Sequence, residues 1–402
     1  MRSDFIPVLL GADINAYSMA RAFYEAYGVK SVVYGIYPAS VCAGSRFIDY
    51  RVRPGNDSVE QVLANAVEVA GQWPDRQILL LGCGDNYLNA ISANLLRYPG
   101  NVIAPYVALP MLEQLIHKEK FYELCERYGI DYPATVVYRK GMGHDFKLPF
   151  DGPFVVKPAE SDTYWKHPFP TQKKAYVLQT RAEVDQVIDQ IYEAGYEDAL
   201  ILQDFIPGDD SYMRVVTNYS GADGKVRLMC VGHVLLEEHT GHAIGNHAVI
   251  ITEHEPELCE KLRAFLEDIR FVGFSNFDIK YDQRDGRFKA FEINCRQGRS
   301  NYYVTGAGYN LAQYLVEDRI ERREQPLTVT KNRHLWQVVP RQVAYDYVNP
   351  RYHEEMRALE KAGAAVNPLV CEADRGLMHR LRIWRGQRRY VKWYASCMEK
   401  VK

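Results

Sequence analysis

Hydrophobic and polar positions alternate with a changing period along the first hundred residues. Short apolar segments at 5–10, 31–35 and 78–81 have the length of strands, and the segments at 16–27 and 59–72 have the apolar spacing of amphipathic helices. Strands that alternate with helices are typical of a parallel sheet covered by helices. The pattern therefore predicts an α/β domain at the start of the chain.

Two of these predicted strands run into small, polar turns, Gly-Ala-Asp at 11–13 and Gly-Cys-Gly-Asp at 82–85. Turns at the carboxyl ends of parallel strands are where ligands usually bind. The glycines have a second explanation, because they also permit a tight turn that binds nothing. Neither turn is a complete G-x-G-x-x-G, so the sequence predicts no dinucleotide site.

The middle of the chain, from about residue 113 to 322, has the mixed periods of an α+β region. Helices are predicted at 112–128, 182–194, 257–269 and 311–322, and strands at 154–157, 200–205, 213–218, 226–235 and in a hairpin within 273–301.

The hairpin carries the most informative pattern of polar residues. Side chains alternate faces along a strand, so Asp278 on the first strand and Glu292 and Asn294 on the second project from one side, opposite an apolar face. Two carboxylates and an amide oxygen are hard ligands suited to Mg²⁺, with Mn²⁺ as an alternative ion. The other explanation is an amphipathic hairpin whose acids face solvent.

The length of the hairpin loop decides whether these side chains share a face. A three-residue loop at 284–286 with glycine in the left-handed position pairs Gln283 with Arg287 and brings Asp278 opposite Glu292. A two-residue loop would scatter the oxygens over both faces.

Two lysines are candidates for neutralising phosphates. Lys157 ends the strand at 154–157 and precedes a proline, so its side chain projects from a fixed point. Lys118 lies on the helix at 112–128, from which it could reach a neighbouring cleft. Either lysine is also explained as a solvated surface charge.

The segment QDFIPGDD reads as a strand that runs into a hinge. The backbone near Phe205 and Ile206 is placed to pair with the edge of an adenine, and Asp209 or Asp210 with ribose hydroxyls. Taken alone, the segment is equally a loop with acidic side chains. The nucleotide-binding candidates of this segment are Gln203, Asp204, Phe205, Ile206 and Asp210.

Composition and charge narrow the class of protein. The 402 residues suffice for two or three domains, and a formal charge of −2 gives no indication of nucleic-acid binding. We expect no signal peptide and no membrane-spanning helix. The eight cysteines are dispersed, without a C-x-x-C pair, which favours reduced thiols in the cytoplasm over disulfides or a zinc site.

The last region, 325–402, is basic. Its segment RLRIWRGQRRYVKWY interleaves arginines with tryptophans and tyrosines. Such a segment could bind a phosphorylated substrate or touch an anionic membrane peripherally. The alternative is a terminal helix docked by its aromatic residues, with its arginines in solvent.

Together and in this order, the pieces resemble the ATP-grasp superfamily. The resemblance rests on Lys118 and on the motifs FVVKP, LQDFIPGDD, FSNFDIKYD and FEINCRQGRS. Longer phrases, among them IPVLLGADINAYSMARAF, YEAGYEDALILQDFIPGDDSYMRV and CVGHVLLE, resemble the D-aspartate ligase family of peptidoglycan cross-bridge synthesis. The resemblance implies an α/β domain at 1–112, ATP-grasp subdomains at 113–206 and 207–324, and a basic extension at 325–402.

The resemblance also implies an activity and its residues. Members of this family use ATP and Mg²⁺ to join the β-carboxylate of D-aspartate, through an acyl phosphate, to the lysine side chain of a nucleotide-linked wall precursor. The implied metal ligands are Asp278, Glu292 and Asn294. By the same resemblance Arg296 and Lys280 have catalytic roles, and Arg299, Ser300 and Arg214 are candidates for binding substrate.

Several points stay open at this level. His233, His242 and His247 are candidate bases for the attacking amine, which could also lose its proton to solvent. Segments 161–165 and 239–249 depart from the family pattern and could change the acid or amine accepted. The alternatives are a ligase for a different substrate pair or an inactive nucleotide-binding protein. The chirality of the acid and the oligomeric state are not fixed by the sequence.

Overall fold

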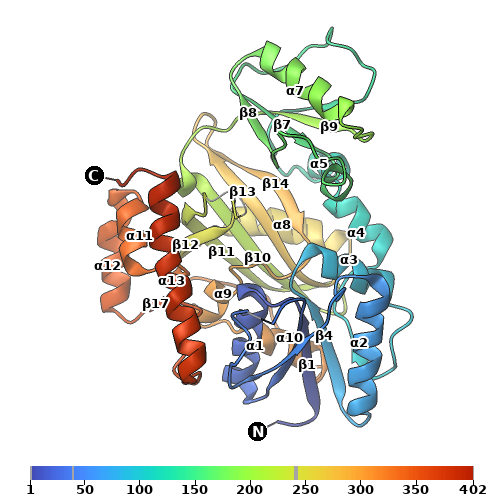
Figure 1. The fold of residues 1–402 in the computed structure, drawn as a ribbon, viewed down its shortest axis with the longest axis vertical. Coiled ribbons are helices and arrows are strands. Elements are labelled where there is room, and N and C mark those ends of the chain that lie inside the picture. The colour runs from blue at the N-terminus through green and yellow to red at the C-terminus, as the bar shows by residue number, and fades with distance from the viewer. Residues whose placement is uncertain (1, 39, 240–242, 402) are drawn as a thin grey trace. The chain divides into compact units, whose positions relative to one another are not determined.

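The structure, a computed structural model, describes residues 2–38, 40–239 and 243–401 (Figure 1). The chain divides into two units, of which the first comprises residues 1–112, 209–278 and 294–402 and the second residues 113–208 and 279–293. This division follows contacts within the chain, and the four-part division made from the sequence stays a prediction.

The N-terminal part of the first unit is a parallel sheet of five strands in the order β3-β2-β1-β4-β5. Its strands and helices are β1 (Phe5–Leu10), β2 (Ser31–Gly35), β3 (Ile48–Val52), β4 (Gln77–Gly82), β5 (Val102–Ile103), α1 (Ile14–Tyr27), α2 (Val59–Gln72) and α3 (Asp85–Ala93). The predicted strands and helices are confirmed. Strands β3 and β5 and helix α3 were not predicted. The sequence of β3, IDYRV, is half polar, and β5 is only two residues long.

The two polar turns lie side by side in this sheet. Strands β1 and β4 are neighbours, and Leu10 pairs with Gly82 at their carboxyl ends. The order of the strands reverses here, since β2 lies on one side of β1 and β4 on the other, which is the usual ligand-binding point of such sheets. Asp13 caps α1 by accepting hydrogen bonds from the N–H groups of Asn15 and Ala16, so this helix begins two residues earlier than predicted.

The second sheet runs β13-β10-β11-β12-β16-β17, with β14 beside β13 and β15 beside β11. Its strands are β10 (Met213–Ser220), β11 (Val226–Glu237), β12 (His247–Glu253), β13 (Gly273–Asp282), β14 (Arg287–Asn294), β15 (Thr328–Val329), β16 (Leu335–Gln337) and β17 (Ala365–Val366). The helices of this part of the chain are α8 (Pro256–Asp268), α9 (Tyr302–Gly306), α10 (Leu311–Arg319), α11 (Arg341–Tyr347), α12 (His353–Lys361) and α13 (Leu377–Cys397), with 3₁₀ turns at Asp210–Tyr212 and Pro350–Tyr352.

The loop of the β13–β14 hairpin is longer than predicted. Strand β13 ends at Asp282, so Gln283 belongs to a four-residue loop at 283–286 and is not paired within a strand as expected. Gly286 has φ +71°, and its N–H donates to the Asp282 carbonyl at 2.8 Å. The predicted left-handed glycine is therefore confirmed, and the predicted loop length was wrong by one residue.

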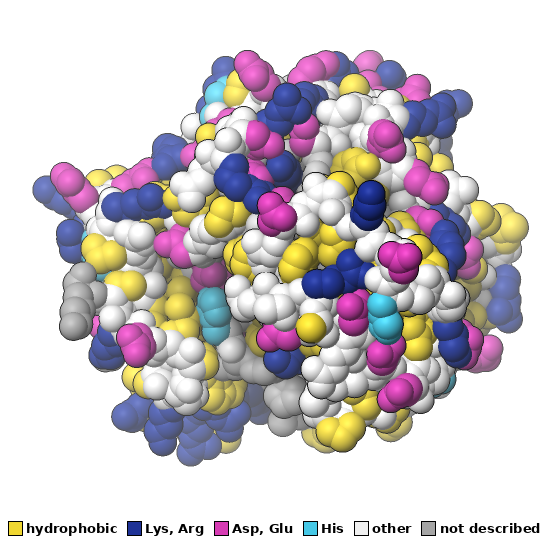
Figure 2. Space-filling model, turned by 90° about the horizontal axis from the view of Figure 1, so that it is seen from above, with side chains coloured by type: hydrophobic (Ala, Val, Ile, Leu, Met, Phe, Trp, Pro, Cys, Tyr) yellow, Lys and Arg dark blue, Asp and Glu magenta, His cyan; other side chains and the backbone are white. Residues whose placement is uncertain are grey.

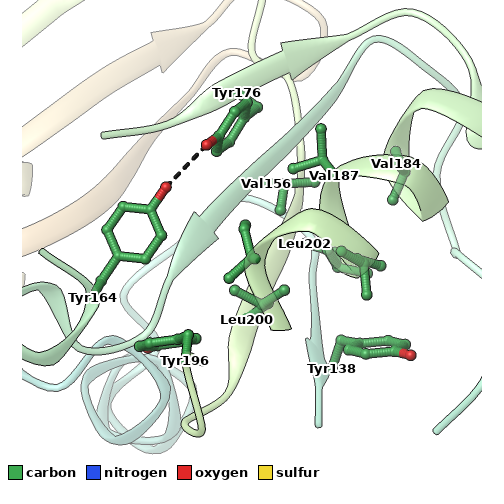
Figure 3. Close-up of a cluster of buried hydrophobic side chains, with 11 residues drawn as sticks. Tyr138, Val156, Tyr164, Tyr176, Val184, Val187, Tyr196, Leu200 and Leu202 are labelled. Atoms are coloured by element: carbon green, nitrogen blue, oxygen red, sulfur yellow. Dashed lines mark hydrogen bonds between the residues drawn. The ribbon is translucent and has the colours of Figure 1, made fainter. Parts of the chain in front are cut away.

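The second unit contains an antiparallel sheet in the order β6-β9-β7-β8. Its elements are β6 (Thr135–Tyr138), β7 (Phe154–Pro158), β8 (Tyr176–Leu178), β9 (Leu200–Asp204), α5 (Lys118–Tyr128), α6 (Ser161–Tyr164) and α7 (Arg181–Glu193), and α4 (Leu109–Ile116) leads into it. Helix α7 packs on this sheet through Val184, Val187 and Ile188 (Figure 3). The hydroxyls of Tyr164 and Tyr176 lie 2.9 Å apart in the same cluster, so the buried tyrosines keep hydrogen-bond partners.

The single helix predicted at 112–128 was wrong. His117 has an extended backbone, with φ −76° and ψ 115°, and it separates α4 from α5. Lys118 is therefore the first residue of a helix and not a position within one. The predicted end at Gly129 is confirmed, because this glycine caps α5 in the left-handed conformation with φ 63°.

Helix α13 contains the basic and aromatic segment of the C-terminal region. Its buried side chains are His379, Ile383, Tyr390 and Tyr394, and the Tyr394 hydroxyl donates to the Glu237 carbonyl at 2.7 Å. Of the four aromatic residues of the segment, Tyr390 and Tyr394 are thus buried, as the docked-helix explanation expects, whereas Trp384 and Trp393 are exposed. Contact of this helix with a phosphorylated substrate or a membrane stays a prediction. No helix in the described part of the chain is long and apolar enough to cross a membrane.

Candidate functional site

Two of the three predicted metal ligands are in contact in the first unit. The Asn294 amide nitrogen donates to the Asp278 carboxylate at 3.1 Å, so these two side chains lie on the same face, as predicted. The amide oxygen of Asn294 accepts a weak hydrogen bond from Arg296 at 3.4 Å. Rotation of the amide would present this oxygen beside the Asp278 carboxylate. Glu292 lies two residues before Asn294 on β14 and therefore projects from the same side of the strand.

An oxygen donor set of this kind fits a hard divalent cation. The described residues contain no group of three or more His, Cys, Asp or Glu side chains arranged to hold a metal ion. The predicted metal ligands are two carboxylates and one amide, so they do not form such a group. Their role as the metal site stays a prediction.

His247 on β12 lies beside Asp278. Its Nε2 is 4.0 Å from a carboxylate oxygen of Asp278 and 4.0 Å from one of Glu237, and its Nδ1 is 3.3 Å from the Ser300 hydroxyl. Burial, together with the nearby Arg299 guanidinium, lowers the pKa of His247 to about 4. The imidazole is therefore neutral at pH 7, and a neutral imidazole is able to accept a proton.

Arg296 is held in a fork by Asp85, the first residue of α3. Its Nε and Nη2 donate to the two carboxylate oxygens of Asp85 at 2.8 and 2.7 Å, and its Nη1 donates to the Gln297 carbonyl at 3.3 Å. Burial opposes the charge, but the Asp85 carboxylate outweighs it and raises the pKa of Arg296 above its usual value. The turn at 82–85 thus supplies the group that fixes the plane of this guanidinium.

Arg299 forms a second ion pair, with the buried Glu238, and also contacts a tyrosine of the C-terminal helix. Its Nη2 is 2.7 Å from the carboxylate of Glu238 and 3.3 Å from the hydroxyl of Tyr390 on α13, and that hydroxyl is also 3.3 Å from Glu238. Glu238 is 3% exposed, and its burial raises the pKa of its carboxyl. Arg299 is therefore the partner of an acid in the structure, and its role in substrate binding stays a prediction.

The remaining candidates of the first unit are engaged with neighbours on the second sheet. Arg214 on β10 donates to Glu253 at 2.6 Å. Asp210 accepts from the Glu237 N–H at 2.8 Å and lies 2.8 Å from Nε2 of His239. His233 lies 2.7 Å from the Ser211 carbonyl, and burial lowers its pKa to about 3, so this ring is neutral. The candidate His242 lies outside the described residues.

The second unit brings both predicted lysines together with Glu292. Lys157 at the end of β7 donates to the Tyr122 hydroxyl at 3.0 Å, and this hydroxyl donates to the Phe291 carbonyl at 2.8 Å. Burial and the like charge of Lys118 lower the pKa of Lys157 to about 7, while the Glu292 carboxylate acts in the opposite direction. The low pKa arises mainly because the ammonium group is buried, with the charge of Lys118 as a second cause.

The hinge residues of the second unit are fixed by hydrogen bonds and an ion pair. Gln203 donates to the Thr135 hydroxyl at 2.8 Å, and Asp204 accepts both Nη groups of Arg284 at 3.2 and 2.6 Å. Lys280 donates to the Gly208 carbonyl at 2.9 Å, with its ammonium 5.5 Å from the centre of the Phe205 ring. Lys280 is thus placed with the hinge, and its catalytic role stays a prediction.

One backbone N–H group of the hinge already has a hydrogen-bond partner within the protein. The Phe205 N–H donates to the Pro153 carbonyl at 3.2 Å, and the side chain of Ile206 is 2% exposed. The Phe205 N–H therefore already has a partner, and pairing of the backbone near Phe205 and Ile206 with an adenine stays a prediction.

Sequence reasoning missed the partners that orient these side chains. Asp85, Glu238, Tyr390 and Tyr122 each touch a candidate from a distant part of the chain. Some signals were present: Asp85 ends the Gly-Cys-Gly-Asp turn, and Tyr390 has helical spacing from the other buried residues of α13.

Comparison with known proteins identifies similar chains. A curated D-aspartate ligase from Enterococcus faecium is 41% identical over 370 residues, which cover 89% of this chain and 87% of the relative. No family model matches the chain.

Solved structures share the fold at low sequence identity. An ADP complex of N5-carboxyaminoimidazole ribonucleotide synthetase matches with a TM-score of 0.61 at 13% identity, over 96% of this chain and 99% of that one. An L-amino acid ligase from Bacillus licheniformis matches with a TM-score of 0.53 at 14% identity, over 79% and 75% of the two chains. These are ATP-grasp enzymes, so the predicted α/β ATP-grasp fold is confirmed.

Proposed function

Because this chain belongs to the D-aspartate ligase family of ATP-grasp enzymes, we propose that it joins the β-carboxylate of D-aspartate to the side-chain amine of lysine in a nucleotide-linked peptidoglycan precursor. The family fixes the reaction type, which is ATP-dependent formation of a C–N bond between a carboxylate and an amine. The observation that carries the choice of D-aspartate is the 41% identity to a D-aspartate ligase over 89% of this chain.

The chemistry needs two displacement steps, because a carboxylate is a poor electrophile. In the first, a carboxylate oxygen attacks the γ-phosphorus of ATP, the bond to the β–γ bridging oxygen breaks, and ADP leaves. In the second, the amine attacks the acyl carbon and loses a proton, and phosphate leaves with the former carboxylate oxygen. Such phosphoryl transfer depends mainly on positioning and on neutralising charge.

In the first unit, two guanidinium groups are candidates for the anionic parts of the reaction. Arg296, held in plane by Asp85, would stabilise charge on the transferring phosphoryl group and on the later oxyanion. Arg299, oriented by Glu238 and Tyr390, would bind a carboxylate of the amino acid, with Ser300 beside it. Arg214 is the second candidate for that carboxylate, in competition with its partner Glu253 in the structure.

His247 is the best-supported candidate for the proton acceptor. Its pKa of about 4 keeps the ring neutral at physiological pH, and its two nitrogens face the Asp278 side and the Ser300 hydroxyl. A weak base accepts a proton effectively only when the amine becomes more acidic as it attacks, which is the case in the second step.

In the second unit, the lysines and the hinge are candidates for binding ATP. Lys157 and Lys118 would neutralise phosphate oxygens, and ATP would in turn supply the negative charge that raises the pKa of Lys157. Hinge residues Gln203 to Ile206 would contact the base. Asp210, which belongs to the first unit, is the candidate for the ribose hydroxyls.

The oxygen ligands fit Mg²⁺, with Mn²⁺ as the other ion of matching chemistry. Asp278, Glu292 and Asn294 would hold it, after rotation of the Asn294 amide away from its present bond to Asp278. When bound, such an ion neutralises phosphate charge and aligns the phosphoryl group.

A cytoplasmic location is part of the proposal. All eight cysteines are free thiols, and most are buried as small apolar side chains, as is usual in a reducing compartment.

The test is phosphate release from ATP with D-aspartate, L-aspartate or no amino acid, each with and without the lysine-containing nucleotide pentapeptide. We expect release only with D-aspartate and the precursor together, and a product heavier by one aspartyl residue. Release with another pair would keep the ligase and replace the substrate. ATP binding without release in any mixture would contradict the proposal and favour an inactive nucleotide-binding protein.

A further inference from the structure

Helix α13 has one face in the protein core and one face in solvent. The buried face contains His379, Ile383, Tyr390 and Tyr394, and the Gln387 side chain adds a hydrogen bond to the Val338 carbonyl at 2.7 Å. The opposite face, here called the outer face of α13, is solvent-exposed. It consists of Arg385, Arg388, Arg389 and Lys392, with Trp384 on one flank and Trp393 on the other.

The segment of the chain that contains the outer face is more basic than the rest of the chain. Seven of the 49 Lys and Arg residues lie between 375 and 392, and no Asp or Glu lies between 375 and 398. The remaining chain is therefore acidic, since the total formal charge is −2. Lys and Arg side chains gather along the lower left edge of Figure 2, on the side where Figure 1 draws α13.

The positive charges of the outer face form no ion pairs with the carboxylates that the structure describes. Over the described part of the chain, no ion pair joins a carboxylate to Arg385, Arg388, Arg389 or Lys392. Arg388 instead lies over the Trp384 ring at 4.9 Å from its centre. Arginines elsewhere in the same unit, such as Arg341 on α11, pair with acids. The outer face thus presents cations without ion-pair partners to solvent.

Large apolar side chains frame these cations. Trp384 is 53% exposed and Trp393 is 43% exposed, and Leu377 and Met378 at the start of the helix are also in solvent. Exposed tryptophans between basic residues are costly in water and favourable at the boundary between lipid headgroups and acyl chains.

We propose that the outer face of α13 docks the protein on an anionic lipid surface. Basic side chains in a row along an exposed helix match the spread-out negative charge of such a surface, and the flanking tryptophans match its headgroup layer. A single phosphorylated ligand would need convergent groups around it, whereas these side chains diverge from the outside of one helix. The helix is already folded and anchored by its buried face, so docking orders no new segment.

The proposal does not depend on the identity of the ligase substrates. Tyr390 and Tyr394 on the buried face contact Arg299, Glu238 and Glu237. Docking by the outer face leaves these contacts intact, so the protein on a lipid surface keeps its candidate substrate residues in place.

The test is sedimentation of the full-length protein with vesicles. One set contains about one third phosphatidylglycerol in phosphatidylcholine, and the other contains phosphatidylcholine alone. We expect binding to the anionic vesicles only, with a steep loss as salt rises from roughly 0.05 M to 0.5 M because the attraction is screened. No binding to anionic vesicles at low salt would overturn the proposal.

Charge-removal variants locate the surface. Arg385→Gln, Arg388→Gln and Lys392→Gln together should weaken binding by about 100-fold, at roughly fivefold for each basic side chain near an anionic membrane. The control variant removes three other exposed lysines, through Lys30→Gln, Lys331→Gln and Lys361→Gln, and should bind within a few-fold of the original protein. Equal loss in both variants would overturn the assignment to α13.

Two further measurements separate the remaining explanations. The double variant Trp384→Ala, Trp393→Ala should weaken the fraction of vesicle binding that persists at high salt. If that fraction is unchanged, the two tryptophans take no part in the docking surface. The KM of the charge-removal variant for the nucleotide-linked precursor, measured without vesicles, should equal that of the original protein. A raised KM would assign the outer face to precursor binding and overturn the proposal.

Discussion

The two units hold their candidate cations in opposite ways. In the first unit, each guanidinium has a carboxylate partner at hydrogen-bond distance: Asp85 for Arg296 and Glu238 for Arg299. In the second unit, Lys157 has a tyrosine hydroxyl at 3.0 Å and a like charge nearby, and its pKa is lowered to about 7. In the first unit, the carboxylates orient arginines that are always charged. In the second unit, Lys157 is held largely in its charged form when an anion binds nearby.

This difference separates two tasks. An arginine that is fixed by a carboxylate is ready to recognise the geometry of a substrate or of developing charge. A lysine with a depressed pKa gains most when a polyanion arrives, because the anion restores its charged form. We therefore expect variants of the first unit to change turnover or amino-acid binding, and variants of Lys157 to change ATP binding.

The largest effect is expected from Arg296→Lys. The lysine keeps a charge but cannot form the fork with Asp85, so it is not held in place. We expect kcat to fall by about 100- to 1,000-fold, the range seen when a donor to developing charge is lost. Steady-state ADP release measures kcat and KM for ATP, and KM should change only a few-fold.

The matched control is Arg263→Lys on α8, an arginine that also pairs with a glutamate but lies outside the candidate site. Its kinetics should be unchanged. Near-normal turnover of Arg296→Lys would contradict the role assigned to Arg296.

The next effect is expected from Lys157→Met. Loss of one phosphate-neutralising cation should weaken ATP binding by about 10- to 100-fold, since a charge-assisted hydrogen bond contributes roughly 1.5–3 kcal/mol. Calorimetric titration with ATP measures the change.

In the original protein, the affinity for ATP should also fall as pH rises above about 7, because binding then has to take up a proton. Affinity that is independent of pH between 6 and 9 would be inconsistent with this account.

Stability should respond to the same group with a defined sign. The folded-state pKa of Lys157 is about 7 and that of an unfolded lysine is about 10.4, so between these values only the unfolded chain holds the proton. The free energy of unfolding therefore rises with pH in this window. Measured by urea unfolding, the original protein should gain stability relative to Lys157→Met from pH 7 to 10; a constant difference would show that the pKa is not depressed.

A smaller effect is expected from Asp85→Asn. The amide keeps the size of the carboxylate but loses its charge and half of the fork, so Arg296 is less well oriented. We expect kcat to fall by about tenfold, which corresponds to about 1.4 kcal/mol, with KM for ATP unchanged. Asp75→Asn, at another exposed acid of the same unit, serves as the control. A change in KM for ATP alone would assign Asp85 a different role.

The smallest effect is expected from Tyr390→Phe. This substitution removes one hydroxyl that contacts both Arg299 and Glu238. KM for the amino acid should therefore rise by about two- to fivefold, which corresponds to the usual free-energy contribution of one neutral hydrogen bond. Tyr394→Phe, whose hydroxyl bonds the Glu237 carbonyl, is the matched control on the same helix. An equal rise in both variants would indicate a general loosening of α13.

Local pattern predicted much of the fold and some of the site. Strands β1, β2 and β4 of the parallel sheet, and the shared side of Glu292 and Asn294 on β14, follow from period and alternation, which are properties of neighbouring residues. The break at His117 was missed because the apolar spacing continues across it, and only the backbone of one residue interrupts the helix. The loop length of the hairpin was misjudged for a different reason, because its turn residues suit loops of three or four residues.

The partners of the candidate residues could not be predicted in this way. Asp85 and Arg296 are 211 positions apart, and Tyr390 and Arg299 are 91 apart. Nothing in the local sequence states which acid will meet which arginine, because tertiary packing makes these pairs. The sequence identified chemically competent residues, and the structure showed which groups hold them.

The central claim is ligation through an acyl phosphate of D-aspartate, and oxygen transfer tests it most directly. D-Aspartate labelled with oxygen-18 in its β-carboxylate is incubated with ATP, Mg²⁺ and the lysine-containing precursor, and the released phosphate is analysed by mass spectrometry. The account predicts one labelled oxygen in each phosphate released and one aspartyl residue in each product. Phosphate without the label, or released without amide product, would contradict it.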